Sequence, residues 1–345
     1  MSKFQFLTVN KILRLTDASV EISFDISNHD NFNFLSGQYI TVKHLINNEE
    51  VRRAYSICSA PTEGLSIGVK LVEGGKMSSF LTKEVKEGDF LEIMPPAGNF
   101  VINQEKDNIV GICAGSGVTP IFSMIKTFLS DDSNAKFTLI YGNQSKGSTM
   151  FLDQLQLLQE DYKKRLTIHW IFSREQVDSS IKGRIDKNTL QQFLNTFPEL
   201  KSADEYFLCG PGELIDNTRE LLLLNNINQS KIHFERFSSA KKESKLTDSK
   251  EILSNVMVSV DGDDFEFTLS NKGQTILDAA MEYGADVPFS CKGAVCCTCK
   301  AKVIEGEVSM DANYSLSEDE VAEGFILACQ AHPKSDNVVI DFDEM

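Results

Sequence analysis

The chain has 345 residues, a net charge of −16 and 41% hydrophobic residues, which is enough for two or three cores. Such an acidic chain is repelled by phosphate backbones, so we expect no nucleic-acid partner. No uninterrupted run of about eighteen apolar residues occurs, so no membrane span is expected. No secretion signal follows Met1, and eight cysteines suit a reducing compartment. We therefore expect a cytoplasmic protein.

The first part of the chain, residues 1–105, alternates polar and apolar residues in short segments. Examples are 19–26, 38–42 and 65–72, which are divided by Gly, Asn and Pro. Regularly spaced strands of this kind predict a small antiparallel β-barrel domain.

Two motifs in this barrel suit a ligand with a flat ring and phosphates. Arg53 and Tyr55 fall on one face of a strand, and Ser56 follows them. A guanidinium can hold a phosphate, an aromatic ring can cover another ring, and a hydroxyl can donate to a ring nitrogen. The second motif, 75–79, precedes a predicted helix whose N-terminus suits a phosphate. Each motif could be local structure alone, but together they favour a flavin dinucleotide.

From residue 107 onward the pattern changes to apolar runs separated by helical stretches. The runs are 109–113, 137–141, 166–172 and 206–209. This alternation predicts an open parallel α/β sheet, whose ligands bind at the carboxyl ends of the strands.

Three motifs follow strands of this predicted sheet. Gly115 and Gly117 lie in a turn before a helix predicted from Ile121, where backbone amides can meet a pyrophosphate. The pattern lacks the third glycine of the Rossmann fingerprint, so a simple tight turn remains an alternative. Ser173-Arg174 suits the 2′-phosphate of NADP or is an ordinary surface pair. The third motif is Cys209-Gly-Pro211, which by itself would be a turn.

A polar, charged segment, 238–250, predicts a flexible linker with a span of roughly 20 Å. After it, 256–260 and 265–269 predict two strands that turn at Asp261-Gly262, and 274–283 predicts a helix.

Four cysteines then follow a spacing typical of plant-type 2Fe-2S proteins. Cys291 and Cys296 are separated by four residues, Cys296 and Cys299 by two, and Cys329 follows after twenty-nine more. Disulfides or incidental buried cysteines do not predict this spacing. The pattern therefore indicates a protein that transfers single electrons, with these four thiolates as iron ligands.

Most of the net negative charge lies in the same region. Residues 251–345 hold 19 of the 50 acidic side chains and 5 of the 34 basic ones. This surface is either simply solvated or a docking face for a less acidic redox partner.

In this order, the motifs resemble the ferredoxin–NADP reductase family fused to a C-terminal plant-type ferredoxin, over essentially the whole chain. Further segments resemble the reductase components of ring-1,2-phenylacetyl-CoA epoxidases; they are 141–143, 183–186, 233–237, 313–316 and 338–343. The resemblance implies a β-barrel FAD domain over 1–105, an α/β NAD(P) domain over 106–237, the linker, and a β-grasp 2Fe-2S ferredoxin domain over 251–345.

The resemblance also implies roles for individual residues. The residues expected to bind FAD are Arg53, Tyr55, Ser56, Lys76, Met77, Ser78 and Phe237. Those expected to bind NADPH are Gly115, Gly117, Thr119, Ser173 and Arg174. Ser56, Cys209 and Glu235 are expected at the site of hydride transfer. Relatives often carry an arginine where this chain has Gln144, so NADH remains possible.

The implied activity is electron transfer from NADPH through FAD and the cluster to an oxygenase, with phenylacetyl-CoA epoxidase as the first choice. A different oxygenase or an acyl desaturase would be served equally well by the same three domains. An electron carrier without a working flavin or nucleotide site is the non-enzymatic alternative.

Overall fold

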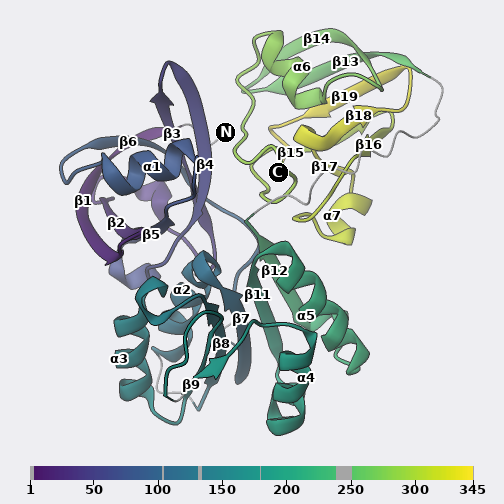
Figure 1. The fold of residues 1–345 in the computed structure, drawn as a ribbon. Coiled ribbons are helices and arrows are strands. Elements are labelled where there is room, and N and C mark those ends of the chain that lie inside the picture. Colours follow the sequence, from purple (N-terminus) through teal and green to yellow (C-terminus); the bar gives the residue numbers. More distant parts are fainter. Residues whose placement is uncertain (1–3, 103–104, 131–133, 179, 238–250, 345) are drawn as a thin grey trace. The chain divides into compact units, whose positions relative to one another are not determined.

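The computed structural model describes residues 4–102, 105–130, 134–178, 180–237 and 251–344. The chain divides into two compact units, one of which comprises Phe4–Phe237 and the other the C-terminal part (Figure 1). The predicted linker, 238–250, lies outside the described residues. Within the described ranges no helix has the length and apolar character needed to cross a membrane.

Six antiparallel strands form the N-terminal sheet, in the order β4-β3-β6-β1-β2-β5. Inward-facing residues such as Leu7, Ile22 and Ile67 have no exposed surface. Ile57, directly after β4, forms an antiparallel bridge to Ile67 of β5, so the two ends of the strand order meet and the sheet closes into the predicted barrel. The elements are β1 (Gln5–Thr16), β2 (Ser19–Asp25), η1 (Asp30–Phe32), β3 (Tyr39–Ile46), β4 (Glu49–Ser56), η2 (Pro61–Glu63), β5 (Leu65–Lys70), α1 (Lys76–Lys83) and β6 (Phe90–Ala97).

The second sheet is entirely parallel, in the order β10-β9-β8-β7-β11-β12. Its strands are β7 (Asn108–Ala114), β8 (Lys136–Asn143), β9 (Leu166–Phe172), β10 (Ile181–Lys182), β11 (Glu205–Gly210) and β12 (Ile232–Arg236). The strand order reverses between β7 and β11, which is where open α/β sheets bind ligands.

Helices cover both faces of this sheet (Figure 1). Ile121 and Leu155, from α2 and α3, belong to one apolar cluster, while Phe193 and Ile215, from α4 and α5, belong to another. The helical elements are η3 (Gly115–Gly117), α2 (Val118–Leu129), η4 (Lys146–Ser148), α3 (Leu152–Tyr162), α4 (Lys187–Thr196), η5 (Pro198–Ser202), α5 (Gly212–Leu224) and η6 (Gln229–Lys231).

The predicted start of α2 at Ile121 was wrong, because the helix begins at Val118. Pro120 is therefore the third helical residue. A proline is tolerated there because the first-turn amides have no intrahelical acceptor.

Helix α2 also joins the barrel to the parallel sheet. Ser123 Oγ donates a 2.6 Å hydrogen bond to the carbonyl of Ser59, and Lys126 forms an ion pair with Glu63. Cys58 of the barrel belongs to the same apolar cluster as α2. These contacts hold α2, and with it the parallel sheet, against the barrel.

The C-terminal unit contains a five-stranded mixed sheet, β14-β13-β19-β15-β17, and a two-stranded sheet, β16-β18. As predicted, β13 and β14 turn at Asp261-Gly262, where both residues have a positive φ. Ile276 and Leu277 of α6 are buried in an apolar cluster with Val258. The elements are β13 (Leu253–Val260), β14 (Asp263–Ser270), α6 (Ile276–Glu282), β15 (Lys300–Glu305), β16 (Val308–Met310), α7 (Glu318–Ala322), β17 (Phe325–Leu327), η7 (Ala328–Gln330), β18 (Ala331–Pro333) and β19 (Asn337–Asp341).

Candidate functional site

The end of β4 holds the first group of predicted flavin ligands. Arg53 is exposed, Tyr55 is half-buried and Ser56 is buried. Ser56 Oγ donates a 3.1 Å hydrogen bond to Glu235 Oε2 of β12. Burial raises the pKa of Tyr55, so its hydroxyl stays protonated. This strand end therefore offers a cation, a neutral aromatic ring and a hydroxyl within four residues.

The carboxyl of Glu235 lies where the barrel meets the parallel sheet. Burial raises its pKa to about 7, against the opposing effect of the hydrogen bond from Ser56. A carboxyl with this pKa gains and loses a proton near neutral pH, which is the property of a general acid or base.

Cys209 lies opposite Glu235 in the pairing of β11 with β12. Its side chain has no exposed surface. Burial, with smaller contributions from Glu235 and Cys113, raises the pKa of the Cys209 thiol. The side chain is therefore a neutral thiol that shapes the site, because only a thiolate is a strong nucleophile.

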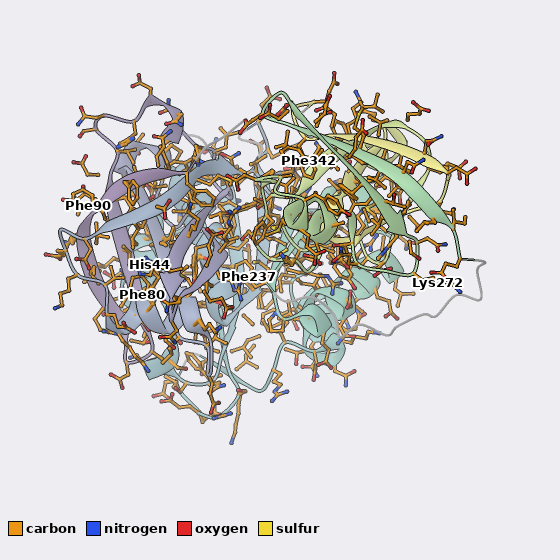
Figure 2. All side chains as sticks on the ribbon, turned by 90° about the horizontal axis from the view of Figure 1, so that it is seen from above. His44, Phe80, Phe90, Phe237, Lys272 and Phe342 are labelled. Carbon is orange, nitrogen blue, oxygen red and sulfur yellow. The ribbon has the colours of Figure 1, made fainter. Side chains whose placement is uncertain are left out.

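Phe237 follows two residues after Glu235, and 41% of its side chain is exposed. Figure 2 labels this side chain. An exposed phenylalanine two residues along the chain from the buried Glu235 carboxyl leaves an apolar surface that a flat ring could cover. The structure therefore brings Ser56, Glu235 and Cys209 together, with Phe237 two residues along the chain from Glu235.

The predicted phosphate motif forms the first turn of α1. No side chain caps this helix at Gly75, so its first amides are open to an external acceptor. Ser78 Oγ accepts from the Val72 amide at 3.1 Å, and Met77 is buried in the barrel core. Lys76 pairs with Glu49. A phosphate bound at this segment would therefore be held chiefly by its backbone amides.

The glycine turn after β7 is a place of close backbone approach. A Cβ at Gly117 would lie 2.2 Å from the Cys209 carbonyl oxygen, so only glycine fits. Thr119 is buried, and its hydroxyl donates to the Ser116 carbonyl at 2.9 Å. The turn thus joins β7 and β11 at the point where the strand order reverses.

Lys70, the last residue of β5, is a candidate site residue that was not predicted from the sequence. Its Nζ lies 3.8 Å from the position that a Cβ would take at Gly115. In the described part of the chain the ammonium has no hydrogen-bond or ion-pair partner, and burial lowers its pKa. A half-buried cation without a partner beside a glycine turn fits an anionic ligand. The sequence signal that could have identified Lys70 is its position at the end of a strand, shortly before a helix whose N-terminus suits a phosphate.

Ser173 and Arg174 lie beyond the end of β9, with Ser173 half-buried and Arg174 exposed. Their backbone amides each donate at 2.9 Å, to the carbonyls of Asn143 and Gln144. Glu175, the next residue, accepts from the Lys146 amide at 2.7 Å. Lys146 and Glu175 line a cavity of about 730 Å³ with Leu13, Leu15 and Leu152. The sequence did not reveal this cavity, because its lining comes from the barrel, from the loops after β8 and β9, and from the start of α3.

The four predicted iron ligands form two pairs in the C-terminal unit. The Cys296 thiol donates to Cys291 Sγ at 3.1 Å, and Cys299 hydrogen-bonds Cys329. No three metal-binding side chains converge on one point in the described ranges. Two pairs of thiols suit two irons better than they suit a single metal ion, which binds three or four donors.

Backbone amides surround these sulfurs. The thiol of Cys296 and then the amides of Gly293, Val295 and Cys296 lower the pKa of Cys291 to about 6. In the same loop Lys292 and Ala294 have positive φ, which turns successive amides inward. Donors aimed at the sulfurs stabilise thiolates, so the loop fits an iron–sulfur cluster.

The side chain of Cys297 belongs to neither of the two thiol pairs. Its Sγ donates to the Ser315 carbonyl at 3.3 Å. This side-chain position agrees with the spacing of the four predicted iron ligands, which does not include Cys297.

Models of three domain families match consecutive parts of the chain. The oxidoreductase FAD-binding domain matches residues 7–102, the oxidoreductase NAD-binding domain 112–220 and the 2Fe-2S iron-sulfur cluster binding domain 258–334.

Relatives match the whole chain. One of the subunits of the 1,2-phenylacetyl-CoA epoxidase of Escherichia coli (strain K12) is 38% identical over 351 residues, which cover 99% of each chain. The ferredoxin reductase component of the 3-ketosteroid-9-alpha-monooxygenase of Rhodococcus rhodochrous is 29% identical over 99% of this chain and 97% of that one.

Among solved structures, phthalate dioxygenase reductase shares the fold, with a TM-score of 0.62, 23% identity and 98% of both chains covered. The order of barrel, parallel sheet and ferredoxin is thus common to these proteins. The chain belongs to the family of NAD(P)H-dependent oxygenase reductases that join a ferredoxin–NADP reductase module, with FAD, to a C-terminal plant-type 2Fe-2S ferredoxin.

Proposed function

We propose that this reductase takes electrons from NADPH and delivers them to the oxygenase component of a phenylacetyl-CoA epoxidase. The observation that carries the proposal is the 38% identity, over 99% of both chains, to a component of the 1,2-phenylacetyl-CoA epoxidase of Escherichia coli. FAD, when bound, supplies the conversion between the two-electron chemistry of NADPH and the one-electron chemistry of the cluster.

In this proposal the residues at the junction of barrel and sheet orient the reacting rings. Ser56 holds the Glu235 carboxyl at 3.1 Å, and Glu235 can keep or release a proton near neutral pH. With FAD bound, the neutral Cys209 thiol and the Phe237 ring, which is exposed in this structure, would help to exclude water from this region. A dry, pre-arranged site favours hydride transfer over loss of electrons to solvent species.

The anionic parts of the two dinucleotides would be bound at separate places. Arg53 and the open amides of α1 serve the FAD pyrophosphate, with Tyr55 covering the isoalloxazine ring. Lys70 and the turn at Gly115 and Gly117 serve the phosphates of NADPH.

Specificity for NADPH depends on the loop after β9. Ser173 and Arg174 can donate to a 2′-phosphate, and Arg provides a bidentate donor set. The Glu175 carboxylate accepts a 2.7 Å hydrogen bond from the Lys146 backbone amide, which holds it against the backbone.

The four paired cysteines would hold the cluster, with Cys291 and Cys296 on one iron and Cys299 and Cys329 on the other. The two thiol pairs support this division. The strongly acidic region 251–345 would then meet a less acidic oxygenase surface. None of the eight cysteines, all of which lie in the described ranges, is in a disulfide, which fits a cytoplasmic protein.

A second candidate acceptor is the oxygenase of a steroid-type monooxygenase, because a reductase of that kind is 29% identical over nearly the whole chain. Fold alone does not distinguish the two acceptors.

The test is anaerobic, NADPH-driven reduction of purified oxygenase components. We expect electrons to reach the phenylacetyl-CoA oxygenase faster than the steroid oxygenase, with a salt-sensitive rate. Equal or preferential transfer to the steroid oxygenase would refute the proposed acceptor.

A further inference from the structure

Gln330 directly follows the fourth proposed ligand, Cys329, and only 3% of its side chain is exposed. Its amide nitrogen, Nε2, has three neighbours. The Cys329 carbonyl oxygen lies at 2.7 Å, the Lys292 carbonyl oxygen at 3.3 Å and Cys329 Sγ at 3.6 Å.

The identity of these neighbours fixes the orientation of the amide. Carbonyl oxygens accept hydrogen bonds, and so does a thiolate sulfur. An amide oxygen in the same position would face three acceptors and be repelled. The NH₂ group of Gln330 therefore faces the cluster loop and the fourth cysteine.

The contact with the Lys292 carbonyl connects parts of the chain that are distant in sequence, whereas the other two contacts are with the preceding residue, Cys329. Lys292 lies in the loop that carries Cys291, Cys296 and Cys299, whereas Cys329 lies in η7. The backbone of Gln330 is fixed as well, since its carbonyl accepts from the Asp311 amide at 2.9 Å. One buried side chain thus joins the loop with three ligands to the segment with the fourth.

A donor on a ligand sulfur also has an electrostatic effect. Reduction adds negative charge to the cluster, and N–H donors near the sulfurs stabilise that charge. The loss of such a donor lowers the reduction potential.

We propose that Gln330 is a positioning residue of the cluster, which holds the cysteine loop against Cys329 and raises the reduction potential through its amide. This inference rests on the ligand set proposed above. Gln330 is not one of the four proposed ligands, so it would act on the cluster through the Cys329 sulfur and through the position of the loop at Lys292.

The test uses the full-length holoprotein with Gln330→Leu, which removes the donor, and Gln330→Glu, which keeps the size but places negative charge beside the sulfur. Gln274→Leu is the matched control, because Gln274 is an exposed glutamine of the same unit that bonds Glu282. Two quantities are measured: the midpoint potential of the cluster by EPR-monitored titration, and the half-life of its absorbance in excess chelator.

We expect Gln330→Leu to weaken reduction by about tenfold in the equilibrium constant, which is about 59 mV for one electron. We expect a larger fall for Gln330→Glu, a shorter half-life for both, and no change for Gln274→Leu. Folded variants that contain no cluster would support the positioning role.

Wild-type potential and half-life in Gln330→Leu would overturn the proposal. Failure of both variants to fold would also overturn it, because Gln330 would then serve folding rather than the cluster. A wild-type protein without a cluster signal would refute the proposed ligand set instead.

Discussion

The two units of the chain build their sites in different ways. In the C-terminal unit, three of the four proposed iron ligands come from one nine-residue loop, 291–299. In the larger unit, the candidate flavin and nucleotide site draws on β4, β5, α1, β7, β11 and β12. A local site depends mainly on the conformation of its loop, whereas a dispersed site depends on how the barrel and the sheet pack. Mutations should therefore act differently in the two units.

The largest expected effect is at the cluster. Cys329→Ser removes one of four ligands, so we expect nearly complete loss of the cluster EPR signal while flavin absorbance remains. Cys297→Ser is the control, because its Sγ bonds the Ser315 carbonyl. If Cys297→Ser loses the cluster and Cys329→Ser retains it, the ligand set is wrong.

In the dispersed site, Ser56→Ala should have the next largest effect. The Ser56 hydroxyl holds Glu235, and loss of one pre-arranged donor costs roughly 10²-fold in rate. Stopped-flow measurement of flavin reduction by NADPH gives this rate. Ser66→Ala, which removes a barrel hydroxyl bonded to Ser23, is the matched control. Equal rates in the two variants would argue against the role of Ser56.

Lys70→Met tests whether the half-buried cation binds phosphate. A hydrogen bond to a charged group contributes about 1.5–3 kcal/mol, so we expect KM for NADPH to rise at least tenfold with little change in kcat. Lys83→Met, at an exposed lysine of α1, should leave KM unchanged. An unchanged KM in Lys70→Met would remove this residue from the nucleotide site.

Arg174→Ala tests cofactor preference. We expect KM for NADPH to rise about tenfold and KM for NADH to stay the same, because NADH lacks the 2′-phosphate. If both constants stay unchanged, the assignment of the 2′-phosphate to this loop is incorrect.

The smallest effect concerns stability in the flavin-free protein. The folded pKa of Glu235, about 7, lies above its usual value of 4.5. The folded state therefore binds the proton more tightly, and the free energy of unfolding falls as pH rises from about 4.5 to about 7. Glu235→Gln stays neutral, so it should gain stability relative to wild type over this range. Urea unfolding at several pH values measures the difference, and a pH-independent difference would contradict the raised pKa.

The contrast between a local site and a dispersed site also explains which features could be predicted from the sequence. The spacing of Cys291, Cys296 and Cys299 is visible because the loop is contiguous, and the strand patterns predicted a barrel followed by a parallel sheet. Lys70 was missed because tertiary packing brings it beside Gly115, and the cavity beside Glu175 was missed because its lining comes from several separate elements. The sequence also could not tell that the Ser78 and Thr119 hydroxyls bond neighbouring backbone groups.

The central claim is that electrons leave this protein through the cluster. It is tested most directly by freeze-quench EPR of the NADPH-reduced protein mixed anaerobically with phenylacetyl-CoA oxygenase, in wild type and in Cys329→Ser. We predict that the wild-type cluster signal rises and then decays as the oxygenase is reduced, and that Cys329→Ser does not reduce the oxygenase although its flavin is reduced. Reduction of the oxygenase by Cys329→Ser at the wild-type rate would contradict the account.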